Sequence, residues 1–213
     1  MTNGLIYSFS GSNHWNFYDW AKYCEGTLYS SQKASADVII NLLGIIAFNS
    51  YKEICQLCFL DFSYDEILST LKIRVREEFL SKDTGLFRMN EETDAYTVLA
   101  NSLAVISGVC TKEEAKKICQ AIVDERLSPC SLSMKTFMYD ALLLTDKDRY
   151  APYVLSEIRR EYKIMLDSGA TTVWETIDGE SAFGNAGSLC HGWSAIPIYY
   201  YNILNSFIDK NPS

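Results

Sequence analysis

Two short stretches near the C-terminal end carry the residues best suited to chemistry. Residues 171–180 read TTVWETIDGE, and SLCHGWSA follows shortly after them. The carboxylate of Glu175 can transfer a proton or accept hydrogen bonds from sugar hydroxyls, and the rings of Trp174 and Trp193 can cover the C–H face of a sugar. His191, one of two histidines in the chain, lies beside Trp193. These residue types favour a carbohydrate site, although a polar loop that Trp174 anchors to the core would contain the same residues.

Charge and cysteine content argue against several other functions. The 213-residue chain has a net charge of -8 and no stripe of Lys and Arg, so a nucleic-acid partner is not expected. Its seven cysteines are an odd number, and the first residues lack the pattern of a signal peptide. We therefore expect a cytoplasmic protein. The longest apolar run, residues 38–48, is too short to span a bilayer, so no membrane partner is expected.

Neither a cofactor nor a metal ion is expected. Cys55 and Cys58 have C-x-x-C spacing, but they lie in a helical stretch without a second cysteine pair or a nearby histidine. Cys190 and His191 are neighbours in the chain, and adjacent side chains at the start of a helix point in different directions. Neither pair therefore predicts a metal site or a Cys-His nucleophile.

The periodicity of apolar residues predicts an all-α fold for residues 1–213, taken as a single domain. Six or seven helices alternate between mostly apolar and amphipathic members, which indicates two layers of helical hairpins. Residues 1–30 are rich in aromatic residues but show no sustained period, so they predict an irregular arm. Thr171–Trp174 is expected to be extended. The predicted helices cover residues 31–59, 63–79, 93–109, 111–126, 133–145, 152–166 and 189–208.

Local signals mark several helix ends. Ser63 with Glu66, and Thr111 with Glu114, have the spacing of a capping box, which predicts two helix starts. Pro152 suits the first turn of a helix. Gly169 is expected to end that helix.

At this point the chain resembles a known family. GATTVWETIDGE followed by SLCHGWSAIPIYYY resembles the C-terminal signature of glycoside hydrolase family 78, the α-L-rhamnosidases. SLSMKTFMYDALL and PYVLSEIRREYKIMLDSGATTVWE follow the helix order of that family, and NFYDW resembles its aromatic loop. The resemblance covers essentially the whole chain and implies a six-hairpin α/α toroid.

The resemblance also implies roles for individual residues. Glu175 would be the general base of an inverting hydrolysis, and His191 would bind the sugar. Trp20 would form an aromatic wall of the sugar subsite. Apart from the resemblance, Asp19 precedes Trp20 and is expected to orient it or to hold a sugar hydroxyl, unless Asp19 lies in a solvated turn. Trp174 and Trp193 would support these groups or line the pocket.

One feature of the family is not found. Its general acid lies in an Asp/Glu/Arg/Trp-rich motif upstream of the aromatic loop, and we expect this chain to hold only the C-terminal half of the (α/α)6 barrel, a partial barrel without that acid. Asp124-Glu125-Arg126 is similar to the motif but follows a charged outer helix, which argues against that role. The chain would then be a glycosidase fragment that acts on a rhamnoside-like carbohydrate.

The alternative is a non-catalytic carbohydrate-binding or vestigial helical domain. In either case a half barrel leaves apolar surface uncovered, which predicts a partner. A second copy, forming a homodimer, or a chain that supplies the N-terminal half barrel would cover it.

Overall fold

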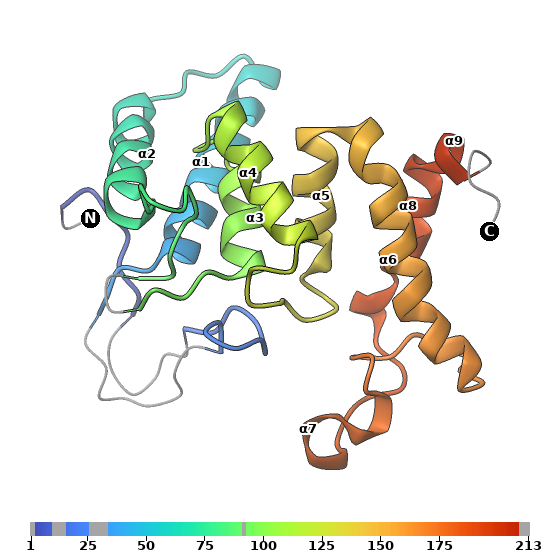
Figure 1. Ribbon diagram of the computed structural model, residues 1–213. Coiled ribbons are helices and arrows are strands. Elements are labelled where there is room, and N and C mark those ends of the chain that lie inside the picture. Colours follow the sequence, from blue (N-terminus) through green and yellow to red (C-terminus); the bar gives the residue numbers. More distant parts are fainter. Residues whose placement is uncertain (1–2, 10–15, 26–33, 91–92, 209–213) are drawn as a thin grey trace. The chain divides into compact units, whose positions relative to one another are not determined.

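The computed structural model describes residues 3–9, 16–25, 34–90 and 93–208. These residues divide into two compact units, Met1–Cys130 (unit 1) and Ser131–Ser213 (unit 2). The described part is helical and contains no strand, which confirms the all-α prediction (Figure 1). Seven of its helices, α1 to α6 and α8, have eight residues or more. The helices are α1 Val38–Leu57, α2 Asp65–Phe79, α3 Val98–Ile106, α4 Lys112–Val123, α5 Lys135–Thr145, α6 Lys147–Asp167, α7 Ala182–Asn185, α8 Ile196–Ile203 and α9 Asn205–Ile208.

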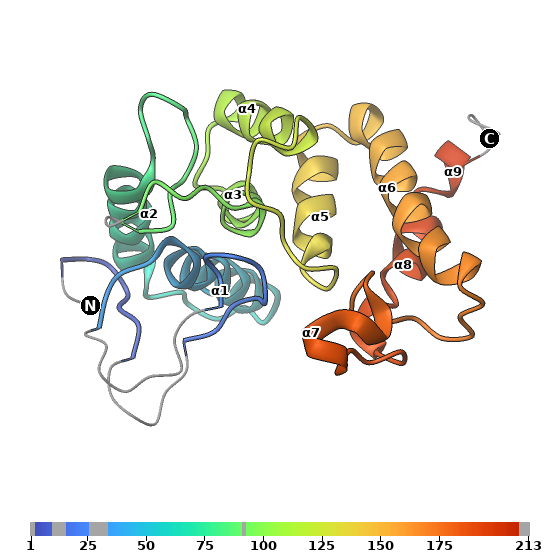
Figure 2. The same cartoon turned by 60° about the horizontal axis from the view of Figure 1, so that its bottom comes forward.

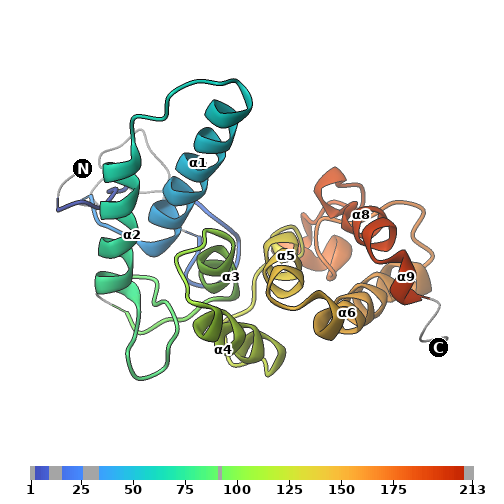
Figure 3. The ribbon, with the colours of Figure 1, turned by 90° about the horizontal axis from the view of Figure 1, so that it is seen from above.

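Helix α1 is the central helix of unit 1. It begins where the Asp37 side chain accepts a hydrogen bond from the backbone N–H of Ile40, and it packs on α2 and α3. Figure 3 shows α1 beside both helices. By length and composition alone α1 could cross a membrane, yet it also supplies core residues such as Leu42 and Ile45. Only 33% of its most apolar window is buried, so part of its apolar surface stays uncovered in unit 1.

Polar side chains on and before α1 hold the irregular N-terminal segments in place. Asn41, fully buried in α1, accepts a hydrogen bond from the Ile6 N–H and donates one to the Ile6 carbonyl. The Tyr18 hydroxyl donates to Asp37 over 2.7 Å. The described parts of the first 30 residues, 3–9 and 16–25, contain no helix, as the sequence predicts.

One of the two predicted capping boxes is present. Thr111 caps α4, and its side chain and that of Glu114 exchange hydrogen bonds with each other's backbone. Ser63 was expected to cap the second helix, but that prediction is wrong, because α2 begins at Asp65 with Tyr64 as its N-cap residue and without a side-chain cap. Two acidic residues in the first turn of α2 favour the helix start through the helix dipole instead.

The Glu114 carboxylate also receives two hydrogen bonds from Arg76 of α2, which joins the second and fourth helices. These bonds, more than any other contact, lower the pKa of Glu114 to about 2. A carboxylate whose pKa falls on folding contributes stability above its unfolded pKa, near 4.5, and loses that contribution as the pH falls toward 2.

We therefore expect Glu114→Gln to lower the free energy of unfolding by about 1.5 kcal/mol at neutral pH, the low end for bonds to charged groups because the pair is partly exposed. The loss should shrink as the pH falls from 4.5 toward 2. Urea unfolding across this range measures it, with Glu113→Gln, an exposed residue of the same first turn, as the control. A Glu114→Gln protein whose stability follows the wild-type pH dependence would contradict the assignment.

In unit 2, α5 packs on α6, and α6 packs on α8 and α9. Helix α6 begins earlier than predicted, because Asp146 caps it by accepting a hydrogen bond from the Arg149 N–H. Pro152 therefore lies inside the helix and not in its first turn, so that prediction is wrong. Gly169 does end the helix: it has φ +76° and donates its N–H to the Leu166 carbonyl.

A buried ion cluster joins α5 to α6. Lys135 bonds the Glu161 carboxylate and lies 3.5 Å from that of Glu157, and Arg160 contacts both acids. The side chain of Glu161 is 4% exposed and that of Lys135 is 14% exposed. Burial alone would raise the pKa of Glu157, but the Arg160 hydrogen bond and the Lys135 charge outweigh it, so the pKa is lowered.

Candidate active site

The two stretches that the sequence singles out lie side by side in unit 2. The Glu175 N–H donates to the Ser188 carbonyl over 2.8 Å, and the His191 N–H donates to the Val173 carbonyl over 2.9 Å. The Thr172 hydroxyl also donates to the Leu189 carbonyl. The bonds pair residues 172–175 with residues 188–191 in opposite directions. Glu175 and His191, 16 positions apart in sequence, therefore come from two paired segments.

Trp174 anchors the loop that connects the paired segments. This loop contains the short helix α7 and projects beyond the ends of α6 and α8 (Figure 2). A Cβ atom on Gly179 would lie 2.9 Å from two ring atoms of Trp174, so the indole lies directly against the Gly179 backbone. A Cβ atom on Gly187 would lie 2.0 Å from the Gly179 carbonyl oxygen. Both positions therefore require glycine for the loop to close.

The Glu175 carboxylate is held on one side only. Its Oε2 atom accepts a hydrogen bond from the Ser188 N–H over 3.1 Å, and the residue is partly buried. Within the described ranges, Glu175 takes part in no ion pair, and its Oε1 atom has no hydrogen-bond partner. The site thus presents a fixed carboxylate with one oxygen available to a water molecule or a sugar hydroxyl.

His191 has a similar arrangement. Its ring stacks on Trp193 with a centroid distance of 3.9 Å and an interplanar angle of 21°. Its Nδ1 atom is buried and has no hydrogen-bond partner among the described residues. Trp193 is 44% exposed, so the stacked pair lies at the surface of unit 2. A partly exposed imidazole whose orientation is fixed by stacking is suited to bind a polar ligand.

Asp19 and Trp20 belong to unit 1. Asp19 is 1% exposed, which excludes a solvated turn, and its N–H donates to the Cys24 carbonyl. Trp20 is 47% exposed and packs against Phe17 at a centroid distance of 4.6 Å. The exposed indole of Trp20 is thus available to a ligand, and the proposed role of Asp19 in orienting it stays a prediction.

Two residues that position the site were not identified from the sequence. Ser188 holds Glu175 through both its carbonyl and its N–H, and its hydroxyl bonds the Cys190 backbone. Tyr162 of α6 donates its hydroxyl to the Ser194 carbonyl over 2.6 Å, which fixes the end of the second segment. Burial, followed by the nearby charge of Glu161, raises the pKa of Tyr162, so the hydroxyl stays protonated as a donor. Backbone-mediated contacts of this kind leave no mark in residue types, although Gly187 before Ser188 is a turn signal.

A separate groove of about 820 Å³ lies between α6, α8 and residues 170–173 of unit 2. Neither Glu175 nor His191 lines it. The groove and the candidate site are therefore two different features of this unit.

Comparison with known proteins gives the family. The model of the family described as the bacterial alpha-L-rhamnosidase 6 hairpin glycosidase domain matches residues 5–203. No curated protein matches the chain. Among solved structures, the chain is similar to a GH78 family rhamnosidase of Bacillus sp. GL1, with a TM-score of 0.77 and 22% identity over 95% of this chain. It is also similar to a rhamnosidase from Klebsiella oxytoca with rhamnose bound, with a TM-score of 0.72 and 16% identity over 96% of this chain.

At these identities the two structures establish the fold alone. The chain spans 22% of the length of the first and 39% of the length of the second. The family match covers most of the 213 residues and agrees with the helical hairpins of both units. The chain belongs to the family of bacterial α-L-rhamnosidase six-hairpin glycosidase domains.

Proposed function

We propose that this chain contributes the general base and part of the sugar site of an inverting glycosidase that acts on α-L-rhamnosides. The single observation that carries the proposal is the pairing of residues 172–175 with 188–191, which brings a carboxylate with an available oxygen and a partly exposed, stacked imidazole onto neighbouring segments. Membership of a rhamnosidase domain family supports rhamnose as the sugar. The Klebsiella oxytoca relative, solved with rhamnose bound, supports the same choice.

In this mechanism the Glu175 carboxylate accepts a proton from a water molecule as that water attacks the anomeric carbon. The water approaches from the face opposite the leaving group, so the configuration inverts. The Ser188 N–H keeps Oε2 in place. His191, whose ring is partly exposed and held by stacking on Trp193, forms a hydrogen bond with a sugar hydroxyl.

No residue of this chain is proposed as the general acid. An inverting site places the acid about 6.5 to 9.5 Å from the base so that a water molecule fits between them. Asp124 is the C-cap residue of α4 and pairs with Arg126 at 3.5 Å. This ion pair favours a charged carboxylate, so Asp124 is not proposed as a proton donor. We propose that the acid comes from a further segment of a six-hairpin barrel. Alone, the chain should therefore favour substrates whose leaving group needs no proton.

Rhamnose binding tests the sugar site separately from catalysis. Calorimetric titration with L-rhamnose should give measurable heat at millimolar sugar, and His191→Ala should weaken binding by about 10- to 100-fold through loss of a hydrogen bond in a partly desolvated site. Glu180→Gln, in the same loop, is the control and should bind as the wild type does. Absence of heat with the wild-type chain, or equal affinity in His191→Ala, would contradict the proposed sugar site. Binding without any hydrolysis would favour the alternative, a carbohydrate-binding domain.

A further inference from the structure

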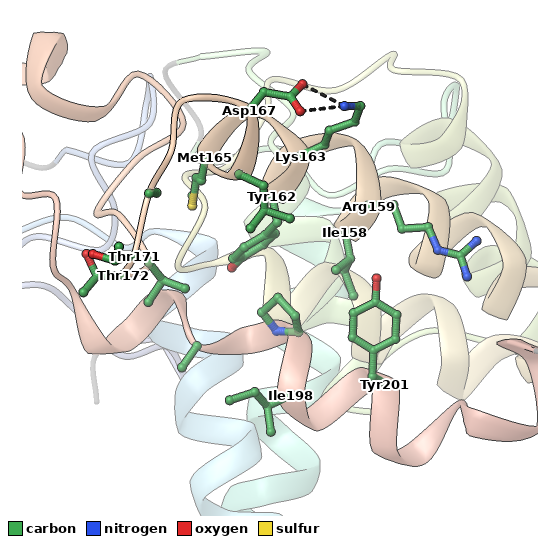
Figure 4. Close-up of a pocket in the computed structure, with 15 residues that line it drawn as sticks. Ile158, Arg159, Tyr162, Lys163, Met165, Asp167, Thr171, Thr172, Ile198 and Tyr201 are labelled. Atoms are coloured by element: carbon green, nitrogen blue, oxygen red, sulfur yellow. Dashed lines mark hydrogen bonds and ion pairs between the residues drawn. The ribbon is translucent and has the colours of Figure 1, made fainter. Parts of the chain in front are cut away.

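The groove on unit 2 is apolar and open. Figure 4 shows side chains of α6 and α8, among them Tyr162, Ile158, Ile198 and Tyr201, lying about a common space. Ile198 is 76% exposed, and Leu166, which also lines the groove, is 70% exposed. Apolar side chains that are exposed together in a concave surface are typical of a protein–protein interface. The groove therefore fits an apolar projection better than a polar ligand.

The groove also carries an uncompensated charge. Lys163 at its edge is paired with Asp167, as the dashed lines in Figure 4 show. Arg159 lines the same groove but forms no ion pair with any residue that the structure describes. A partner with a carboxylate beside its apolar surface would match this edge of the groove.

Unit 1 carries an apolar projection of this kind at the end of α1. Leu57, Phe59 and Leu60, here called the apolar tip, are 79%, 96% and 62% exposed. They lie where the chain leaves α1 toward α2, in the connection visible in Figures 1 and 3. Glu53 and Asp61 flank the tip, and neither forms an ion pair within the described residues. The tip thus combines apolar side chains with free carboxylates, the complement of the groove.

The backbone conformation of Phe59 costs stability, which indicates that its exposed side chain has a role. The Phe59 N–H donates to the Gln56 carbonyl and the Leu60 N–H to the Cys55 carbonyl, and Phe59 has φ +56°. This is the Schellman end of a helix, where the left-handed residue is usually glycine. Gly169 occupies the equivalent position at the end of α6, with φ +76°. A phenylalanine in this conformation costs stability and gains no burial in its own chain.

We propose that the apolar tip of one copy of this chain inserts into the α6–α8 groove of a second copy. The contact is head-to-tail, since it joins two different surfaces. Glu53 or Asp61 of one copy would then face Arg159 of the other. The proposal is independent of the catalytic role of Glu175.

Sedimentation velocity of the full chain across the micromolar range tests the contact. The wild type should dimerise, and Phe59→Glu or Ile198→Glu should each weaken dimerisation by about 30-fold or more, as expected at the centre of an interface. Both side chains are exposed, so neither change should prevent folding. Leu144→Glu, at a residue that is 67% exposed on α5 and does not line the groove, is the control and should leave dimerisation unchanged.

Mixing the two variants distinguishes a head-to-tail contact from other arrangements. A mixture of Phe59→Glu and Ile198→Glu should partly recover the dimer, because the intact tip of one variant meets the intact groove of the other. Phe59→Gly should raise the melting temperature of the monomer by on the order of 2 to 4 °C while it weakens the dimer, since it relieves the backbone strain and removes the inserted ring. If Phe59 had only a structural role, the substitution would not raise the melting temperature of the monomer while weakening the dimer.

Three results would overturn the proposal. The first is a wild-type chain that stays monomeric throughout the concentration range. A monomeric chain that co-sediments with phosphatidylcholine vesicles would count as the same result, because the apolar tip would then bind lipid and not a second copy. The second is a dimer that neither Phe59→Glu nor Ile198→Glu weakens. The third is a mixture of the two variants that remains monomeric, because an intact tip and an intact groove would then be present without binding each other.

Discussion

Glu175→Gln should lower the rate of hydrolysis of 2,4-dinitrophenyl α-L-rhamnoside by about 100- to 10,000-fold, the contribution typical of a positioned general base. Dinitrophenolate leaves without protonation, so this substrate reports the base step in a chain for which no acid is assigned. Glutamine keeps the shape of the side chain, and its carbonyl oxygen can still accept the Ser188 N–H bond. It cannot accept the proton of the attacking water. Release of dinitrophenolate, followed by absorbance, measures the rate.

The matched control for this variant is Glu180→Gln. Glu180 is exposed in the loop between the paired segments, so the same substitution should leave the rate unchanged. Near-ultraviolet circular dichroism of both variants checks that Trp174 still packs against Gly179. Equal rates for Glu175→Gln and the wild type would remove Glu175 from the mechanism. If the wild-type chain does not release dinitrophenolate, the chain has no hydrolytic activity without a further segment.

Lys135→Met should lower the free energy of unfolding by about 3 to 5 kcal/mol, the usual cost of leaving a buried charge without its partner. Glu161 is 4% exposed and depends on Lys135 for its direct ion pair, because Arg160 is more distant at 3.5 Å. Chemical denaturation at neutral pH measures the change. Lys163→Met is the control, since the Lys163–Asp167 pair lies on the surface of α6 and should contribute about 0.5 kcal/mol.

The double variant Lys135→Met with Glu161→Leu should recover much of the lost stability, because it removes the unpaired carboxylate together with its partner. Similar losses in Lys135→Met and Lys163→Met would mean that the cluster is not effectively buried. This test concerns α5 and α6 and is therefore independent of the sugar site.

The sequence predicted the helices more reliably than their ends. Apolar periodicity identified every long helix, because burial of one face dominates helix formation in a domain of this size. The ends depend on single side-chain contacts. Thr111 and Glu114 form the predicted capping box, whereas Ser63 does not cap α2. Asp146 caps α6, so this helix begins at Lys147, five residues before Pro152. Leu189–Ile208 was predicted as one helix, but α8 begins only at Ile196, because residues 188–191 pair with residues 172–175.

For the site, the sequence supplied the residue types and the resemblance supplied their roles. The extended conformation expected for Thr171–Trp174 agrees with its pairing to the segment that ends at His191. Ser188 and Tyr162 could not be found in this way, because they act through backbone carbonyls and N–H groups that any residue possesses. Phe59 was missed for another reason: its left-handed conformation is visible only in the folded chain.

The stereochemistry of the first product tests the central claim most directly. Proton NMR during hydrolysis of 2,4-dinitrophenyl α-L-rhamnoside shows which anomer of rhamnose forms before mutarotation mixes the two. If Glu175 directs water to the face opposite the leaving group, β-L-rhamnose appears first. If α-L-rhamnose appears first, the configuration is retained, and Glu175 is not the base of an inverting hydrolysis.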